Sequence, residues 1–137
     1  MPLILEVAAA LIQDAQGRYL ITQRRRGSHL EGLWEFPGGK CDAGESLSDC
    51  LMRELREELK AAARIGREIH ATTYRYEDRI VELHFLECEL AGDPQPQLGQ
   101  EMRWVPRGEL QRLSFPPADQ ELIRLLTAPQ SSPRPQS

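Results

Sequence analysis

Three glutamates near the middle of the 137-residue chain, Glu54, Glu57 and Glu58, fall at helical spacing. Residues three and four apart share a helix face, so in a helix the carboxylates would project together, with Cβ atoms about 5–6 Å apart. A hard divalent cation such as Mg²⁺ or Mn²⁺ takes oxygen ligands and would remove their mutual repulsion. The spacing therefore indicates a cation site for a phosphate-bearing substrate, or, on the simpler interpretation, a solvated charged face.

The surrounding residues predict the helix itself. Ser46 followed by Asp49 is typical of an N-terminal capping box, so the helix is expected to begin just after Gly44 and Glu45. One face repeats a bulky aliphatic residue every four positions, which predicts burial of that face. The repeated residues are Leu47, Leu51, Leu55 and Leu59.

Two further features are expected to position the carboxylates. Arg53 precedes Glu57 by one turn, so it can pair with that glutamate and fix the orientation of its carboxylate. Gly38 and Gly39 lie just upstream, and glycine lets the backbone turn tightly and approach an ion or ligand closely.

A longer pattern makes the interpretation more specific. One stretch of the sequence resembles the signature box of the Nudix hydrolases, G-x5-E-x7-R-E-U-x-E-E-x-G-U, with U a bulky aliphatic residue. It consists of Gly39, five residues, Glu45, seven residues, and the block Arg-Glu-Leu-Arg-Glu-Glu-Leu at 53–59. If each of the six fixed positions matched by chance about 0.07 of the time, the pattern would arise about once in 10⁷ starts. Lys60 and Ala61 depart from the box. The departures do not affect the carboxylates, but the sequence does not predict how the helix ends.

The resemblance implies an α/β fold, the Nudix α/β/α sandwich with a mixed β-sheet, and Mg²⁺-dependent hydrolysis of a nucleotide, with Mn²⁺ as an alternative ion. The implied metal ligands are Gly38 through its carbonyl, Glu45, Glu54, Glu57 and Glu58. The implied catalytic residues are Arg53, Glu54, Glu57 and Glu101. The general base is either a glutamate of the box or Glu101, because Leu98 stands where many relatives have a glutamate six residues before Trp104.

Residues upstream of the box resemble the Glu-Phe-Pro-Gly-Gly-Lys approach of the MutT-type nucleoside triphosphate pyrophosphohydrolases within that family. Phe36 is expected to lie in the core or to contact the base, and Trp34 in the core. Lys40 is expected to meet a phosphate or solvent. Arg24 is expected to act as a charge clamp, or as part of a solvated strand end.

Asp119 bears on the choice of substrate. MutT-type enzymes that clear 8-oxo-dGTP have Asn at the matching position, where the amide donates to a carbonyl and accepts from the oxidised ring. An ionised Asp119 would only accept, which favours the exocyclic amine of cytosine or adenine, as in relatives that hydrolyse CTP or modified dCTP. Burial that kept Asp119 protonated would let it mimic the amide. A simple helix N-cap role is also open.

The whole-chain features set limits on the function. One domain over residues 1–128 and a disordered tail over 129–137 are expected from the length and composition. A net charge of −4 argues against binding to duplex nucleic acid, and the apolar N-terminus is too short to span a membrane. The odd number of cysteines, Cys41, Cys50 and Cys88, predicts core thiols in a reducing cytoplasm.

The other elements follow from periodicity. Residues 3–12 and 18–23 predict a hairpin, and residues 65–76 and 80–90 a longer one, with His70 and His84 as hydrogen-bonded strand residues. A short strand is expected at 101–106, then a helical turn and a C-terminal helix after Asp119.

The sequence thus predicts a monomeric or homodimeric enzyme for a small nucleotide. A non-catalytic Nudix-fold binding module is the alternative.

Overall fold

The computed structural model describes residues 3–28 and 30–128, so the predicted tail at 129–137 lies outside the described residues. No helix in these two ranges is both long and apolar enough to cross a membrane. In chain order, the elements are β1 (Leu3–Ile12), β2 (Tyr19–Gln23), β3 (Trp34–Glu35), β4 (Gly38–Lys40), α1 (Leu47–Leu59), β5 (Ala62–Arg75), β6 (Arg79–Ala91), β7 (Met102–Val105), the 3₁₀ turns η1 (Arg107–Arg112) and η2 (Pro117–Asp119), and α2 (Gln120–Thr127).

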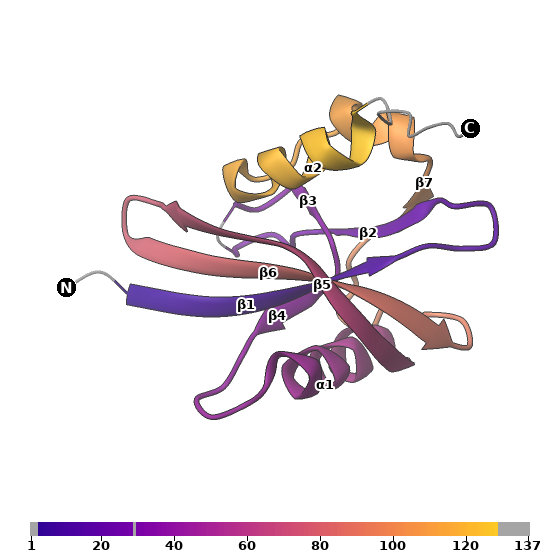
Figure 1. Cartoon of the computed structure of the whole chain (residues 1–137), viewed down its shortest axis with the longest axis horizontal. Coiled ribbons are helices and arrows are strands. Elements are labelled where there is room, and N and C mark those ends of the chain that lie inside the picture. Colours follow the sequence, from indigo (N-terminus) through magenta and orange to yellow (C-terminus); the bar gives the residue numbers. More distant parts are fainter. Residues whose placement is uncertain (1–2, 29, 129–137) are drawn as a thin grey trace, which may run out of the picture.

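Two sheets organise the chain (Figure 1). The larger is mixed, with the order β4-β1-β6-β5, because β1 runs parallel to β6 while the other two pairings are antiparallel. The smaller sheet is antiparallel, with the order β3-β2-β7. The predicted mixed sheet is therefore confirmed, with a second sheet beside it.

The central strand β1 is covered on both faces. Ala8 and Ala10 belong to the apolar cluster that contains the buried face of α1, whereas Ala9 and Leu11 belong to the cluster that contains residues of α2. Successive strand residues point to opposite faces, so an unbroken aliphatic run is what a doubly covered strand requires. Figure 1 shows α1 and α2 on opposite sides of the larger sheet, and the predicted α/β/α sandwich is confirmed.

The predicted hairpin of the first two strands is only partly correct. The turn forms, since Gly17 N donates to the Asp14 carbonyl at 2.9 Å, but the strands pair only through the bridge between Gln13 and Tyr19. Beyond it, β1 and β2 enter different sheets. The reason is that β4 and β6 already occupy both edges of β1.

The second predicted hairpin is confirmed, because β5 and β6 pair along most of their length with two register shifts between Ile65 and His70. His84 Nδ1 lies 2.8 Å from a Glu68 carboxylate oxygen, as expected of a hydrogen-bonded strand residue. For His70 the prediction is confirmed only in part, since the residue lies in β5 but its buried Nε2 has no hydrogen-bond partner within the described ranges and faces Glu121 at 3.6 Å.

Candidate functional site

The helix α1 is capped at both ends. Ser46 is the N-cap, and its hydroxyl accepts from Asp49 N at 3.0 Å, as the capping pattern predicts. At the other end, Lys60 takes the left-handed conformation with φ 53°, and its N–H donates to the Arg56 carbonyl at 3.0 Å. This is a position that favours glycine. The departure from the box at Lys60 therefore leaves the helix exit unchanged in shape.

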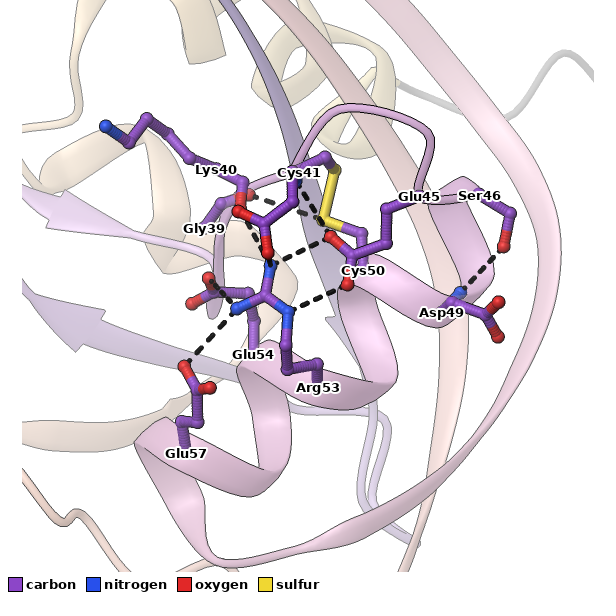
Figure 2. Close-up of polar contacts among 11 residues, drawn as sticks. Gly39, Lys40, Cys41, Glu45, Ser46, Asp49, Cys50, Arg53, Glu54 and Glu57 are labelled. Atoms are coloured by element: carbon purple, nitrogen blue, oxygen red, sulfur yellow. Dashed lines mark hydrogen bonds and ion pairs between the residues drawn. A yellow bond between two sulfur atoms is a disulfide. The ribbon is translucent and has the colours of Figure 1, made fainter.

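Arg53 holds three box glutamates at once (Figure 2). Its Nε and Nη2 donate to the two oxygens of Glu45 at 2.8 and 2.9 Å. Its Nη1 donates to Glu54 at 2.9 Å and to Glu57 at 3.4 Å, and Nη2 also reaches the Lys40 carbonyl at 3.1 Å. We call Arg53, Glu45, Glu54 and Glu57 the Arg53 cluster. A single guanidinium fixes its three carboxylates, a stronger positioning role than the predicted pair with Glu57 alone.

Glu45 is held most tightly within the Arg53 cluster. Besides its bidentate pair with Arg53, it accepts from Asp42 N at 2.8 Å, so the loop before α1 folds around the carboxylate. The hydrogen bonds from Arg53 and Asp42 N lower the pKa of Glu45 to about 2. This side chain is an anion throughout the physiological range.

The two glycines bring β4 against its neighbours. A Cβ on Gly38 would lie 2.0 Å from the Ala8 carbonyl oxygen, and its φ of 152° also disfavours a side chain. A Cβ on Gly39 would lie 2.2 Å from a Glu54 carboxylate oxygen. Gly38 N donates to Glu58 at 3.3 Å. The glycine pair therefore lets the backbone contact two of the box carboxylates directly.

Glu58 and Glu54 are box carboxylates whose pKa is raised by burial. Burial, with Glu35 as the next largest cause, raises the pKa of Glu58 to about 8. Burial also raises the pKa of Glu54 and outweighs the hydrogen bond from Arg53. A divalent ion would reverse both effects, and an all-oxygen donor set suits Mg²⁺ or Mn²⁺. The residues present therefore fit such an ion.

The five predicted metal ligands are nonetheless divided into two groups. Glu45, Glu54 and Glu57 turn to Arg53, whereas Glu58 turns to Gly38 N. Over residues 3–28 and 30–128, no three Asp, Glu, His or Cys side chains converge as metal ligands would. The metal assignment of the box therefore remains a prediction.

A cavity of about 400 Å³ extends from the box across β1 and β3. This volume is within the range of small-molecule sites in proteins. Its walls combine residues of the box with residues far from it in sequence. They include Gly38, Gly39, Lys40 and Glu58 from the box region, and Arg24, Glu35, Phe36, Tyr76, Gln100 and Asp119.

Asp119 is buried in the wall of this cavity, with 5% of its surface exposed. It is the N-cap residue of α2, as the simpler interpretation has it, but its side chain makes no capping hydrogen bond. Burial, assisted by the negative charge of Glu35, raises the pKa of Asp119 to about 8. Burial likewise raises the pKa of Glu35, although Glu35 accepts from Arg24 at 2.7 Å. We call Glu35, Glu58 and Asp119 the cavity acids.

With this geometry in view, comparison with known proteins is informative. The family model for the NUDIX domain matches residues 8–125. The chain belongs to the Nudix family. It is a MutT-like Nudix hydrolase, and enzymes of this family typically depend on divalent cations.

Named relatives agree on the family and differ in substrate. This Nudix hydrolase is 38% identical to the 8-oxo-dGTP diphosphatase of Haemophilus influenzae over 90% of this chain and 91% of the relative. It is 35% identical to the CTP pyrophosphohydrolase of Escherichia coli over 91% and 93%. The solution structure of the E. coli ORF135 protein superposes with a TM-score of 0.81 at 34% identity, covering 93% of this chain and 91% of the other.

Of the remaining predicted site residues, Phe36 and Lys40 line the cavity of this Nudix hydrolase and Glu101 does not. Phe36 is buried, stacks on Phe115 with ring centroids 5.4 Å apart, and also lines the cavity. Lys40 is exposed at the cavity rim. Glu101 is exposed and lies outside the residues that line the cavity, so its proposed role as base has no support from its position.

Three cavity residues escaped the sequence analysis. Glu35 lies between the buried aromatics Trp34 and Phe36, a context that signals partial burial of an acid. Gln100 is buried, and its amide donates to the Glu58 carbonyl at 3.4 Å. The Tyr76 hydroxyl accepts from Ala118 N at 3.3 Å, a contact between residues 42 positions apart that no local pattern predicts.

The prediction of core cysteines is confirmed for Cys50 and Cys88, and Cys41 is partly buried against the same apolar cluster, but the pairing of two of them was not predicted. Cys41 and Cys50 form a disulfide, with Cα atoms 5.2 Å apart, while Cys88 is a free buried thiol. Counting cysteines by motif missed the pair because its nine-residue separation matches neither a C-x-x-C nor a zinc pattern. The tight turn from β4 into α1 brings the two residues together.

Proposed function

We propose that this Nudix hydrolase converts 8-oxo-dGTP and water to 8-oxo-dGMP and pyrophosphate, with Mg²⁺ as the cation. The observation that carries the proposal is that Asp119, buried with a raised pKa, lines the same cavity as the box residues Gly38, Gly39 and Glu58. One cavity therefore has room for both a base and a phosphate chain.

The base assignment rests on the proton of Asp119. With a pKa of about 8, most of this carboxyl is neutral at pH 7. A neutral carboxyl has one O–H donor and a carbonyl acceptor, the pattern of an amide. The donor suits the ring carbonyl of 8-oxoguanine and the acceptor suits the hydrogen on its N7. Phe36, in the same wall, offers an aromatic surface to the base.

The phosphate chain would lie against the box. Glu54, Glu57 and Glu58, with Glu45 and the Gly38 carbonyl, are the groups that would hold the cation. When bound, Mg²⁺ neutralises phosphate oxygens and makes a water more acidic.

The chain's own residues would supply position and proton transfer. Arg53 fixes the direction of Glu54 and Glu57, since it donates to both. A box glutamate would take the proton from the attacking water, because Glu101 is exposed away from the cavity. Lys40 at the rim is a cation for the departing pyrophosphate.

Hydrolysis of CTP or a modified dCTP is the second candidate. It is supported by the 35% identity to the E. coli CTP pyrophosphohydrolase and by the occurrence of Asp rather than Asn at position 119. An ionised Asp119 would accept from the cytosine amine. The two candidates therefore differ in the protonation state that Asp119 must have.

A substrate panel tests the proposal. The enzyme is assayed at pH 7 with Mg²⁺ and 8-oxo-dGTP, dGTP, CTP or dCTP, and the products are identified by mass. The expected result is the highest kcat/KM for 8-oxo-dGTP, with pyrophosphate as co-product. A higher kcat/KM for CTP would establish the second candidate instead, and release of orthophosphate would exclude both.

A further inference from the structure

Cys41 and Cys50 close a loop inside the box. Cys41 directly follows β4, and Cys50 lies in the first turn of α1. The disulfide therefore ties the two ends of the segment 42–49 together. This segment contains Glu45, the box residue that precedes the helix.

The closed loop is linked to the Arg53 cluster by hydrogen bonds. Glu45 accepts from Asp42 N within the loop and from Arg53 on the helix. In addition, the Asp42 carboxylate lies 3.7 Å from Arg53 Nη2. Arg53 in turn holds Glu54 and Glu57. A change in the loop is therefore transmitted through one guanidinium to the carboxylates of the helix.

The two sulfurs differ in access. Cys41 is partly exposed, whereas Cys50 is fully buried beneath the loop. Figure 2 shows the disulfide inside the arch of the loop that connects Cys41 to Glu45. Thiol–disulfide exchange requires access of an attacking thiolate to one sulfur and departure of the other. Cys41, as the less buried of the two residues, is therefore the one that offers its sulfur to an external thiolate.

We propose that Cys41 and Cys50 form a reversible thiol–disulfide site, and that its reduction by a dithiol lowers turnover by releasing the loop that positions Glu45 for Arg53. This goes beyond the proposed function, which assigns no role to sulfur. The partner is any small or protein dithiol that carries two adjacent thiols.

The exchange balances in two steps. A thiolate of the dithiol attacks Cys41 Sγ, the bond between the two protein sulfurs breaks, and Cys50 leaves as a thiolate that takes a proton. The second thiolate of the dithiol then attacks the dithiol sulfur that is bonded to Cys41 Sγ. That bond breaks, and Cys41 leaves as a thiolate that also takes a proton. Two electrons and two protons pass to the protein, and the dithiol is oxidised to its disulfide.

The surroundings of Cys50 accommodate both oxidation states. In the first turn of α1, the positive end of the helix dipole stabilises a departing thiolate. Cys50 Sγ also lies 3.8 Å from the Gly39 carbonyl oxygen, so a reduced thiol has an acceptor beside the glycine pair. Reduction therefore loosens the loop without leaving a buried thiol unpartnered.

The test is a titration of the full chain with reduced and oxidised dithiothreitol at fixed ratios. Thiols are trapped with an alkylating reagent under denaturing conditions and counted by mass. We expect a single transition from one to three labelled thiols, with faster amide exchange in residues 42–49 of the reduced protein. Three labelled thiols at every ratio, or equal exchange rates in the two states, would overturn the proposal.

Activity follows the same titration, with variants as controls. We expect kcat to fall about tenfold on reduction while KM changes little, since the loop positions the cation-binding groups rather than the base. Cys88→Ala should keep this response, because Cys88 is outside the pair. Cys41→Ser and Cys50→Ala should have the low kcat at every ratio, and an unchanged kcat through the transition would refute control by the disulfide. An oxidised enzyme that hydrolyses no triphosphate contradicts the proposed function alone, because the thiol count and amide exchange do not depend on it.

Discussion

The Arg53 cluster and the cavity acids contain the same functional group in opposite settings. In the Arg53 cluster, three hydrogen bonds from a guanidinium and a backbone amide lower the pKa of Glu45 to about 2. Among the cavity acids, burial raises the pKa of Glu58 and of Asp119 to about 8. The Glu58 carboxylate accepts from Gly38 N at 3.3 Å, with no guanidinium bonded to it in the described part of the chain. The donors and the burial of each carboxyl, rather than its residue type, decide its charge.

This contrast separates two tasks. A permanent anion such as Glu45 suits the binding of a cation, whereas a neutral acid such as Asp119 suits the reading of a base by donor and acceptor. Glu54 is intermediate, because it contacts Arg53 and yet burial raises its pKa.

Loss of a carboxylate from the Arg53 cluster should have the largest effect on turnover. Glu57→Gln keeps the shape but removes the charge, and we expect kcat in Mg²⁺ to fall about 10³-fold. The Glu57 side chain is 62% exposed, so the midpoint of thermal unfolding should not change. Turnover equal to that of the unmodified enzyme would remove Glu57 from the metal site.

A smaller loss is expected when only the geometry of the Arg53 cluster is changed. Arg53→Lys keeps the charge but cannot reproduce the planar fork that holds Glu45 on two sides, so kcat should fall about 100-fold. Arg56→Lys is the matched control, because Arg56 is exposed on the same helix. Equal activity of the two variants would mean that charge alone is needed at position 53.

Among the cavity acids, Glu35 can be neutralised without a change in size. Its negative charge contributes to the raised pKa of Asp119, with burial as the larger cause. Glu35→Gln should therefore lower the pKa of Asp119 while leaving it above the ordinary value. The carboxyl ¹³C shift of Asp119, followed against pH by NMR, measures this change. An unaltered titration midpoint would show that the two acids do not interact.

The smallest effect concerns the end of α1. Lys60 has φ 53°, where a side chain is strained, so Lys60→Gly should raise the free energy of unfolding by about 0.5–1 kcal/mol. Lys60→Ala keeps a Cβ and is the control, for which no such gain is expected. Denaturant unfolding compares the three proteins, and equal stability of the glycine and alanine variants would rule out strain at this cap.

Helix α1 and much of the Arg53 cluster were predictable from local periodicity and spacing, whereas the sandwich fold was implied by the resemblance to the Nudix box. The leucine repeat and Ser46 define α1, and the residues that Arg53 contacts on the helix lie within one turn of it. The pairing of β1 with β6 was not predicted, since parallel strands 76 positions apart leave no turn between them in the sequence, as the register of Ala8 with His84 shows.

The cavity acids were less predictable because their properties arise from packing. Sequence pattern identified Asp119 as a candidate, yet its protonation depends on burial and on the charge of Glu35 in β3, an element far from it in sequence. The Cys41 to Cys50 disulfide likewise depends on the turn between β4 and α1. A spacing rule has no access to such contacts between elements.

The central claim, that Asp119 reads the base as a neutral acid, is tested most directly by kcat/KM for 8-oxo-dGTP and for CTP between pH 6 and 9.5. Because the pKa of Asp119 is raised to about 8, its proton is present below that pH and lost above it. The neutral fraction that suits 8-oxo-dGTP falls about tenfold between pH 7 and 9 while the ionised fraction that suits CTP rises about tenfold, so the ratio of the two values should fall about 100-fold. Asp119→Asn cannot titrate at this position, so its ratio should vary only with the ionisation of the substrates. A ratio that is flat or rises with pH in the unmodified enzyme, or one that falls equally in Asp119→Asn, would contradict the account.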